Sequence, residues 1–137
     1  MQSARFDDAF FADMQSSIVD VNAACMLPPA CYTDPEFFRF ELAAIFSQEW
    51  LCVGREAWIR TPGEYFTADQ AGERIIIVRQ QDGTVAALSA VCQHRAMLIA
   101  EGRGKTRTFI CPYHHWTYEL DGTLVGAPAM EKACNFD

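Results

Sequence analysis

Several features that common protein classes require are scarce or missing in this sequence. Its 137 residues carry a formal net charge of −7, so it lacks the basic excess with which proteins bind nucleic acid. It has no run of about 18 consecutive apolar residues, the length that spans a membrane. Asp7, Asp8 and Asp13 stand where a secretory signal would carry positive charge. These absences predict a cytoplasmic protein with no nucleic acid and no membrane partner.

Histidine is scarce as well, with three residues, whereas cysteine is plentiful, with six. In a reducing cytosol, cysteines are more often free thiols or metal ligands than disulfides. Half of all residues are apolar and 21% are charged, which is enough for one domain with a buried core. The spacing of the cysteines and histidines must therefore indicate what they do.

Residues 1–50 are predicted to form a helical arm. Apolar residues recur at helical intervals over residues 6–21, namely Phe6, Phe10, Met14, Ile18 and Val21. A second helix is predicted to begin with Thr33 as N-cap, Pro35 in the first turn and Glu36 completing a capping box. It should end near Trp50. Its expected buried face consists of Phe38, Leu42, Ile45 and Phe46.

Residues 51–137 have the pattern of an antiparallel β domain, with short β-branched runs separated by turn signals. Two of these signals, Asp82-Gly83 and Asp121-Gly122, predict tight type I′ hairpins. The fold class is therefore mainly β with an N-terminal helical arm. The candidate strands are Leu51–Val53, Tyr65–Thr67, Ile75–Arg79, Val85–Ser89, Thr108–Ile110, Trp116–Leu120 and Thr123–Val125.

Two short segments each combine one cysteine with one histidine, within loops at about 90–97 and 109–118. Cys92 and His94 form the first pair, and Cys111 and His114 form the second. Thiolate and neutral imidazole are ligands of zinc and iron-sulfur sites. Zinc sites usually pair cysteine with cysteine and histidine with histidine, whereas a Rieske 2Fe-2S centre needs two thiolates on one iron and two imidazoles on the other. The mixed pairs favour the Rieske centre, and a structural zinc domain is the alternative.

Residues 91–128, from VCQH to VGAP, resemble the cluster-binding segment of Rieske proteins. Together with residues 27–83 they resemble the N-terminal domain of the alpha subunit of Rieske non-heme iron ring-hydroxylating oxygenases. The resemblance implies a Rieske-type antiparallel β-sandwich with a small cluster-binding subdomain. It also implies a 2Fe-2S cofactor held by Cys92, His94, Cys111 and His114.

The same resemblance implies a path for electrons. A ferredoxin or flavin reductase would reduce the cluster, and His114 would pass the electron to the mononuclear iron in the catalytic domain of the same or a neighbouring alpha subunit. That iron needs two histidines and a carboxylate. Only His115 remains after the cluster is formed, so we expect a dioxygenase or monooxygenase piece truncated before its catalytic domain. A free-standing Rieske ferredoxin is the alternative.

Differences from the family pattern carry further expectations. High-potential Rieske proteins have an extra cysteine pair and a serine where this chain has Met97, Tyr113 and Trp116, which predicts a low potential. Tyr118 matches a position whose hydroxyl approaches a ligand sulfur, although it could equally be a core tyrosine. Ala96 and His115 replace the usual glycines, which puts the loop geometry in question.

Residues outside the two pairs have weaker interpretations. The basic residues Arg95, Arg103, Lys105 and Arg107 could steer an acidic electron donor, or could be an ordinary solvated loop. The remaining cysteines have no matching partners, and we expect buried or idle thiols. They are Cys25, Cys31, Cys52 and Cys134.

Overall fold

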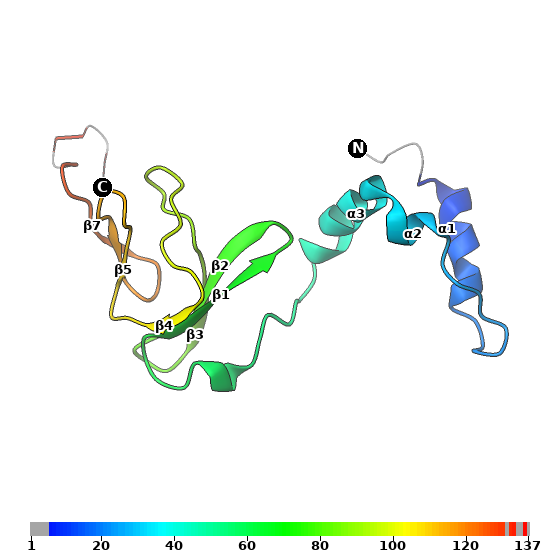
Figure 1. Cartoon of the computed structure of the whole chain (residues 1–137), viewed down its shortest axis with the longest axis horizontal. Coiled ribbons are helices and arrows are strands. Elements are labelled where there is room, and N and C mark those ends of the chain that lie inside the picture. Colours follow the sequence, from blue (N-terminus) through cyan, green and yellow to red (C-terminus); the bar gives the residue numbers. More distant parts are fainter. Residues whose placement is uncertain (1–5, 131, 134–135, 137) are drawn as a thin grey trace. The chain divides into compact units, whose positions relative to one another are not determined.

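The computed structural model describes residues 6–130, 132–133 and 136, and the chain divides into two compact units, Met1–Leu51 and Cys52–Asp137 (Figure 1). The first unit is helical and the second is built from antiparallel strands. The predicted class, mainly β with an N-terminal helical arm, is confirmed. Within the described part of the chain, no helix is long and apolar enough to cross a membrane.

The helical unit is held together by packed phenylalanine rings. Helix α1 (Asp8–Met14) is capped by Asp7, whose carboxylate accepts a hydrogen bond from the Phe10 N–H at 3.0 Å. A 3-10 turn at Gln15–Ser17 ends it, so Ile18 and Val21 are exposed and the predicted helix over residues 6–21 is too long. The rings in edge or tilted contact are those of Phe6, Phe10, Phe11, Phe37 and Phe40.

The second predicted helix begins one residue later than expected. Thr33 is the last residue of α2 (Ala30–Thr33), and Asp34 caps α3 (Pro35–Glu41) by accepting from the Glu36 N–H at 2.8 Å. The predicted capping box between Thr33 and Glu36 is therefore wrong. The buried ring is Phe37 and not Phe38, because Phe37 meets the phenylalanines of α1. A π-helical turn, Leu42–Phe46, continues the helix but ends before Trp50, and Ile45 and Phe46 are exposed.

The β unit contains two antiparallel sheets. The larger has the order β3-β2-β1-β4, with β1 at Glu64–Gln70, β2 at Glu73–Arg79, β3 at Val85–Ser89 and β4 at Arg103–Lys105. The smaller has the order β5-β6-β7, formed by Phe109–Ile110, Thr117–Tyr118 and Leu124–Gly126. Leu51–Val53 is not a strand, and β4 was not predicted.

The hairpin turns differ from the predicted type. At Asp82-Gly83 and Asp121-Gly122 only the glycine has a positive φ, +86° and +91°, whereas a type I′ turn needs two such residues. In each turn the aspartate accepts a hydrogen bond from the N–H two residues further along the chain. The type I′ pattern occurs instead at Ala71-Gly72, between β1 and β2, where both φ angles are positive.

Strand β2 lies at the centre of the packing. Its alternating side chains face two clusters: Ile76 and Val78 belong to the larger core, and Ile77 packs with Ile59 and Phe66 in a smaller one. The larger core contains Cys92 and Cys111. The two cysteines of the sequence motif are thus integral to the main core of the β unit.

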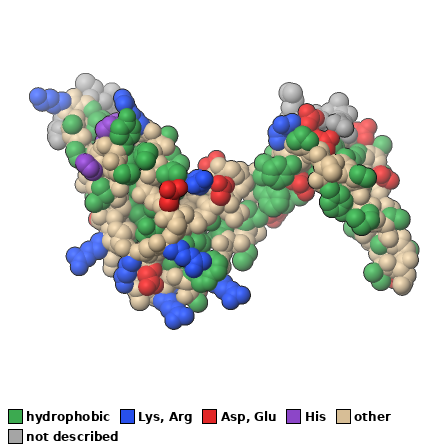
Figure 2. Space-filling view, in the orientation of Figure 1, with side chains coloured by type: hydrophobic (Ala, Val, Ile, Leu, Met, Phe, Trp, Pro, Cys, Tyr) green, Lys and Arg blue, Asp and Glu red, His purple; other side chains and the backbone are tan. Residues whose placement is uncertain are grey.

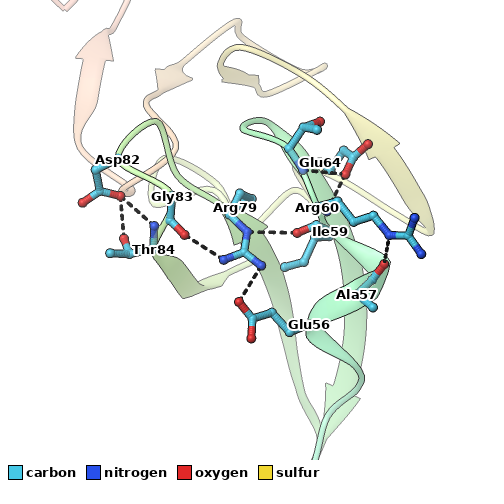
Figure 3. A network of polar contacts seen from close by, with 10 residues as sticks. Glu56, Ala57, Ile59, Arg60, Glu64, Arg79, Asp82, Gly83 and Thr84 are labelled. Atoms are coloured by element: carbon cyan, nitrogen blue, oxygen red, sulfur yellow. Dashed lines mark hydrogen bonds and ion pairs between the residues drawn. The ribbon is translucent and has the colours of Figure 1, made fainter.

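Arg79, the last residue of β2, holds the C-terminal end of this strand in place (Figure 3). Its guanidinium donates to the Ile59 carbonyl at 2.9 Å, to the Gly83 carbonyl at 2.7 Å and to the Glu56 carboxylate at 2.8 Å. The side chain is 11% exposed. It therefore ties the 3-10 turn Glu56–Trp58 and the β2–β3 hairpin to one strand.

Candidate metal centre

The two cysteine-histidine segments fold into loops of the same design. In the first, the Cys92 N–H donates to the Met97 carbonyl at 2.8 Å, and the Ala96 N–H donates to the Cys92 carbonyl at 2.9 Å. In the second, the Cys111 N–H donates to the Trp116 carbonyl at 2.8 Å, and the His115 N–H donates to the Cys111 carbonyl at 3.0 Å. Each loop thus presents one cysteine and one histidine from the same backbone geometry.

Both loops pass through the left-handed region at equivalent positions. Ala96 has φ +55° and His115 has φ +59°. These are the positions where the family commonly has glycine, so the same turn is made here by residues that bear a Cβ. Residues 112–114 form a turn, so the adjacent His114 and His115 do not lie on an extended segment.

The loops bring the four predicted ligand residues together. The Cys92 and Cys111 thiols are buried, at 2% and 1% exposure, in the same core cluster. The rings of His94 and His114 lie 4.6 Å apart between centroids at 70°. Each histidine has a buried Nδ1 with no hydrogen-bond partner in the part of the chain that is described. Two thiols and two unsatisfied imidazole nitrogens fit the donor set of a Rieske cluster.

The surroundings of Cys92 favour its thiolate. Burial by itself raises the pKa of this thiol, but a hydrogen bond from the Tyr118 hydroxyl and further hydrogen bonds from backbone N–H groups and Cys111 bring it below its ordinary value. The Tyr118 oxygen lies 3.3 Å from Cys92 Sγ and also accepts from the Gln93 N–H at 3.2 Å. Tyr118 is both a core residue and a contact of the sulfur.

The surroundings of the second histidine favour its neutral form. Desolvation lowers the pKa of His114, and the positive potential of His94 and Arg95 lowers it further. A neutral imidazole is the form that binds a metal. The ionisation of both Cys92 and His114 is thus shifted toward the metal-binding state.

Aromatic side chains flank both histidines. The Trp116 indole is stacked on His94, with centroids 4.8 Å apart and planes 8° from parallel. Tyr113 lies against His114, at 3.9 Å and 31°. Trp116 is 6% exposed and Tyr113 is 56% exposed. From the sequence, Tyr113 and Trp116 are considered only as replacements for the cysteine and serine of the high-potential class. Their contacts with the histidines are not predicted, although both residues lie within two positions of His114.

The predicted basic group is divided. Arg95 lies in the first loop, and its positive charge helps to lower the pKa of His114. Arg103 and Lys105 belong to β4, where Arg103 lies 4.1 Å above the Trp58 ring and Lys105 donates to the Thr61 hydroxyl at 2.7 Å. Figure 2 shows basic side chains along the lower edge of the β unit and others at the upper end, beside the visible histidines.

The other cysteines that the structure describes are free thiols. Cys25 and Cys52 are exposed, and Cys31 is partly buried. Burial raises the pKa of Cys31, and the nearby Glu41 carboxylate raises it further. Cys134 lies outside the described residues.

Residues 49–137 match the model of the Rieske [2Fe-2S] domain, and the chain belongs to this family. Its cofactor is a Rieske-type 2Fe-2S cluster. The relatives are oxygenase subunits, as the sequence resemblance implied.

Two curated relatives illustrate this. The glycine betaine monooxygenase oxygenase subunit of Chromohalobacter salexigens is 44% identical over 102 residues, covering 74% of this chain and 23% of that protein. The benzene 1,2-dioxygenase subunit alpha of Pseudomonas putida is 37% identical over 111 residues, covering 79% and 25%.

Solved structures agree with the fold. The apo form of the quaternary ammonium Rieske monooxygenase CntA superposes with a TM-score of 0.77 at 37% identity, over 80% of this chain and 32% of that chain. Naphthalene 1,2-dioxygenase from Rhodococcus sp. has the same TM-score at 32% identity, over 93% and 29%. The chain therefore spans about a quarter to a third of the relatives it matches.

Proposed function

We propose that this chain is the electron-transfer domain of a Rieske oxygenase. Residues 51–137 form the cluster domain and residues 1–50 its helical arm. Cys92 and Cys111 hold one iron, and His94 and His114 hold the other. When bound, the cluster supplies a centre that gains and loses one electron at a time.

The observation that carries this proposal is the convergence of two matching loops. Together the two loops place two buried thiols in one core cluster and two imidazoles with unsatisfied Nδ1 atoms side by side. Among the described residues, no group of three or more His, Cys, Asp or Glu side chains is arranged to bind a single metal ion. A Rieske centre takes two protein ligands per iron.

The potential is low in this proposal. Met97, Tyr113 and Trp116 cannot form the disulfide or supply the serine hydroxyl of the high-potential class. Fewer hydrogen bonds then stabilise the reduced, more negative state. Tyr118 supplies one hydrogen bond to a ligand sulfur, since its hydroxyl contacts Cys92.

The relatives support a proposed source and destination for the electron. The relatives are dioxygenase and monooxygenase subunits, and they are several times as long as the segment that matches this chain. A cytoplasmic ferredoxin or flavin reductase is the proposed donor. The proposed acceptor is a mononuclear iron in a catalytic domain of the same or a neighbouring alpha subunit, for aromatic-ring hydroxylation or a related monooxygenation.

The test is electron paramagnetic resonance (EPR) and metal analysis of the anaerobically purified chain. After dithionite reduction we expect a Rieske signal and two irons per chain. His114→Ala should abolish the signal, and His115→Ala should keep it, because the Nδ1 of His114, unlike that of His115, is among the buried atoms without a hydrogen-bond partner. A colourless, EPR-silent protein with one zinc would overturn the proposal in favour of a structural zinc domain.

A further experiment separates the domain from a free-standing ferredoxin. The gene beyond codon 137 should encode a downstream pair of histidines and a later aspartate. A natural stop codon at that point would instead favour the carrier.

A further inference from the structure

Each of the two imidazoles packs against an aromatic ring of the second loop. A metal-binding histidine is normally oriented by a hydrogen bond from its second ring nitrogen to a carboxylate or a carbonyl. Packing of the ring against a rigid neighbour is a second kind of contact that restricts its angle.

Ring packing provides that contact for His94. The Trp116 indole covers one imidazole face almost in parallel, at 8° and 4.8 Å. The indole is itself held in the main core, at 6% exposure, together with both cysteines. Since a rotation of His94 about χ2 would drive its ring edge into the indole, the stack restricts the ring to one plane.

The two histidines are held differently. Tyr113, which lies against His114, is 56% exposed and belongs to no buried cluster in the described chain. Its ring is tilted by 31° and not parallel. His94 therefore packs against a buried ring and His114 against a solvent-exposed one.

We infer that Trp116 is the positioning residue of His94: its buried indole, stacked on the imidazole, sets the plane in which Nδ1 would meet the iron. The inference rests on the proposed function. It predicts that the two histidine ligands can be perturbed one at a time, His94 through Trp116 and His114 through Tyr113.

The experiment is pulsed EPR of the reduced, cluster-loaded chain, in which each ligand histidine gives its own nitrogen coupling. Trp116→Leu should change one coupling and leave the other, and should release iron to a chelator about 10- to 100-fold faster, the usual effect of losing an orienting contact. Trp116→Phe keeps an aromatic face and should resemble the wild type. Tyr113→Leu should change the other coupling.

Phe109→Leu is the matched control, because it removes a buried ring from the same core that contacts Tyr65 and neither histidine. If Trp116→Leu does not accumulate, Trp116→Met fills the space without an aromatic face. Unchanged couplings in the Trp116 variants, or changes equal to those of Phe109→Leu, would overturn the inference. A wild-type chain with no Rieske signal would instead refute the proposed function itself.

Discussion

Replacing Tyr118 with phenylalanine should lower the reduction potential of the loaded protein. The Tyr118 hydroxyl lies 3.3 Å from Cys92 Sγ and accepts from the Gln93 N–H at 3.2 Å, so its own proton is directed to the sulfur. Burial first, and then the contact with Cys92, raise the pKa of Tyr118 to about 12, so the hydroxyl stays a donor at any working pH. Reduction makes the sulfur more negative and strengthens this hydrogen bond.

The size of the shift follows from the hydrogen bond. A hydrogen bond to a charged group contributes about 1.5–3 kcal/mol, and if roughly half of this is gained on reduction, the difference is about 1 kcal/mol. For a one-electron couple, 59 mV corresponds to a tenfold change, or about 1.4 kcal/mol, so the midpoint should fall by about 40 mV.

The assay is a dye-mediated redox titration followed by EPR. Tyr65→Phe is the control, because Tyr65 packs against the same core but has no contact with Cys92. The reasoning would be refuted if the midpoint potential of Tyr118→Phe equalled that of Tyr65→Phe, or if it rose above the wild-type value.

Three further predictions concern the scaffold. Gly63→Ala should destabilise the fold by about 3 kcal/mol or more, because a Cβ there would meet the Thr106 carbonyl oxygen at 2.1 Å; Gly72→Ala, with a similar φ but open space, should cost only about 1 kcal/mol in urea unfolding. Equal losses would contradict the steric argument. Glu64→Gln should lower the melting temperature above pH 4.5. Since backbone hydrogen bonds first, and Lys105 last, lower the pKa of Glu64, the advantage of the wild type should vanish as pH falls through that lowered value. A difference that persists in acid would contradict this. Ala96→Gly should stabilise the chain by about 0.5–1 kcal/mol, because it relieves a left-handed alanine; a loss of stability in the same assay would show that the turn is unstrained.

The strands that sequence reasoning found are those with a strong local pattern. Val85–Ser89 has the same bounds in the structure, and Ile75–Arg79 lies within β2. The strand Arg103–Lys105 was missed because two basic residues and a glycine have little strand propensity. It exists because its backbone pairs with β1, with Arg103 opposite Phe66, and such a long-range pairing leaves no local signal.

Turn and cap positions were predicted to within a residue, because neighbouring residues offered the same chemistry. Thr33 and Asp34 can both cap a helix, and Pro35 at the first helical position decides for Asp34. At the metal centre, the motif predicted which residues would meet. It could not predict that Trp116 would stack on His94, because ring packing depends on how the two loops approach each other in space.

The matching loops have a consequence for how the protein holds its cofactor. Each loop is closed by two hydrogen bonds of its own backbone, and neither of these involves the other loop. Each half of the cofactor site is therefore ordered by contacts of its own backbone, and the conformational entropy of presenting one cysteine and one histidine is lost separately in each loop. A substitution that opens one loop should accordingly weaken the hold on the cluster through that loop's two ligands and leave the geometry of the other pair unchanged.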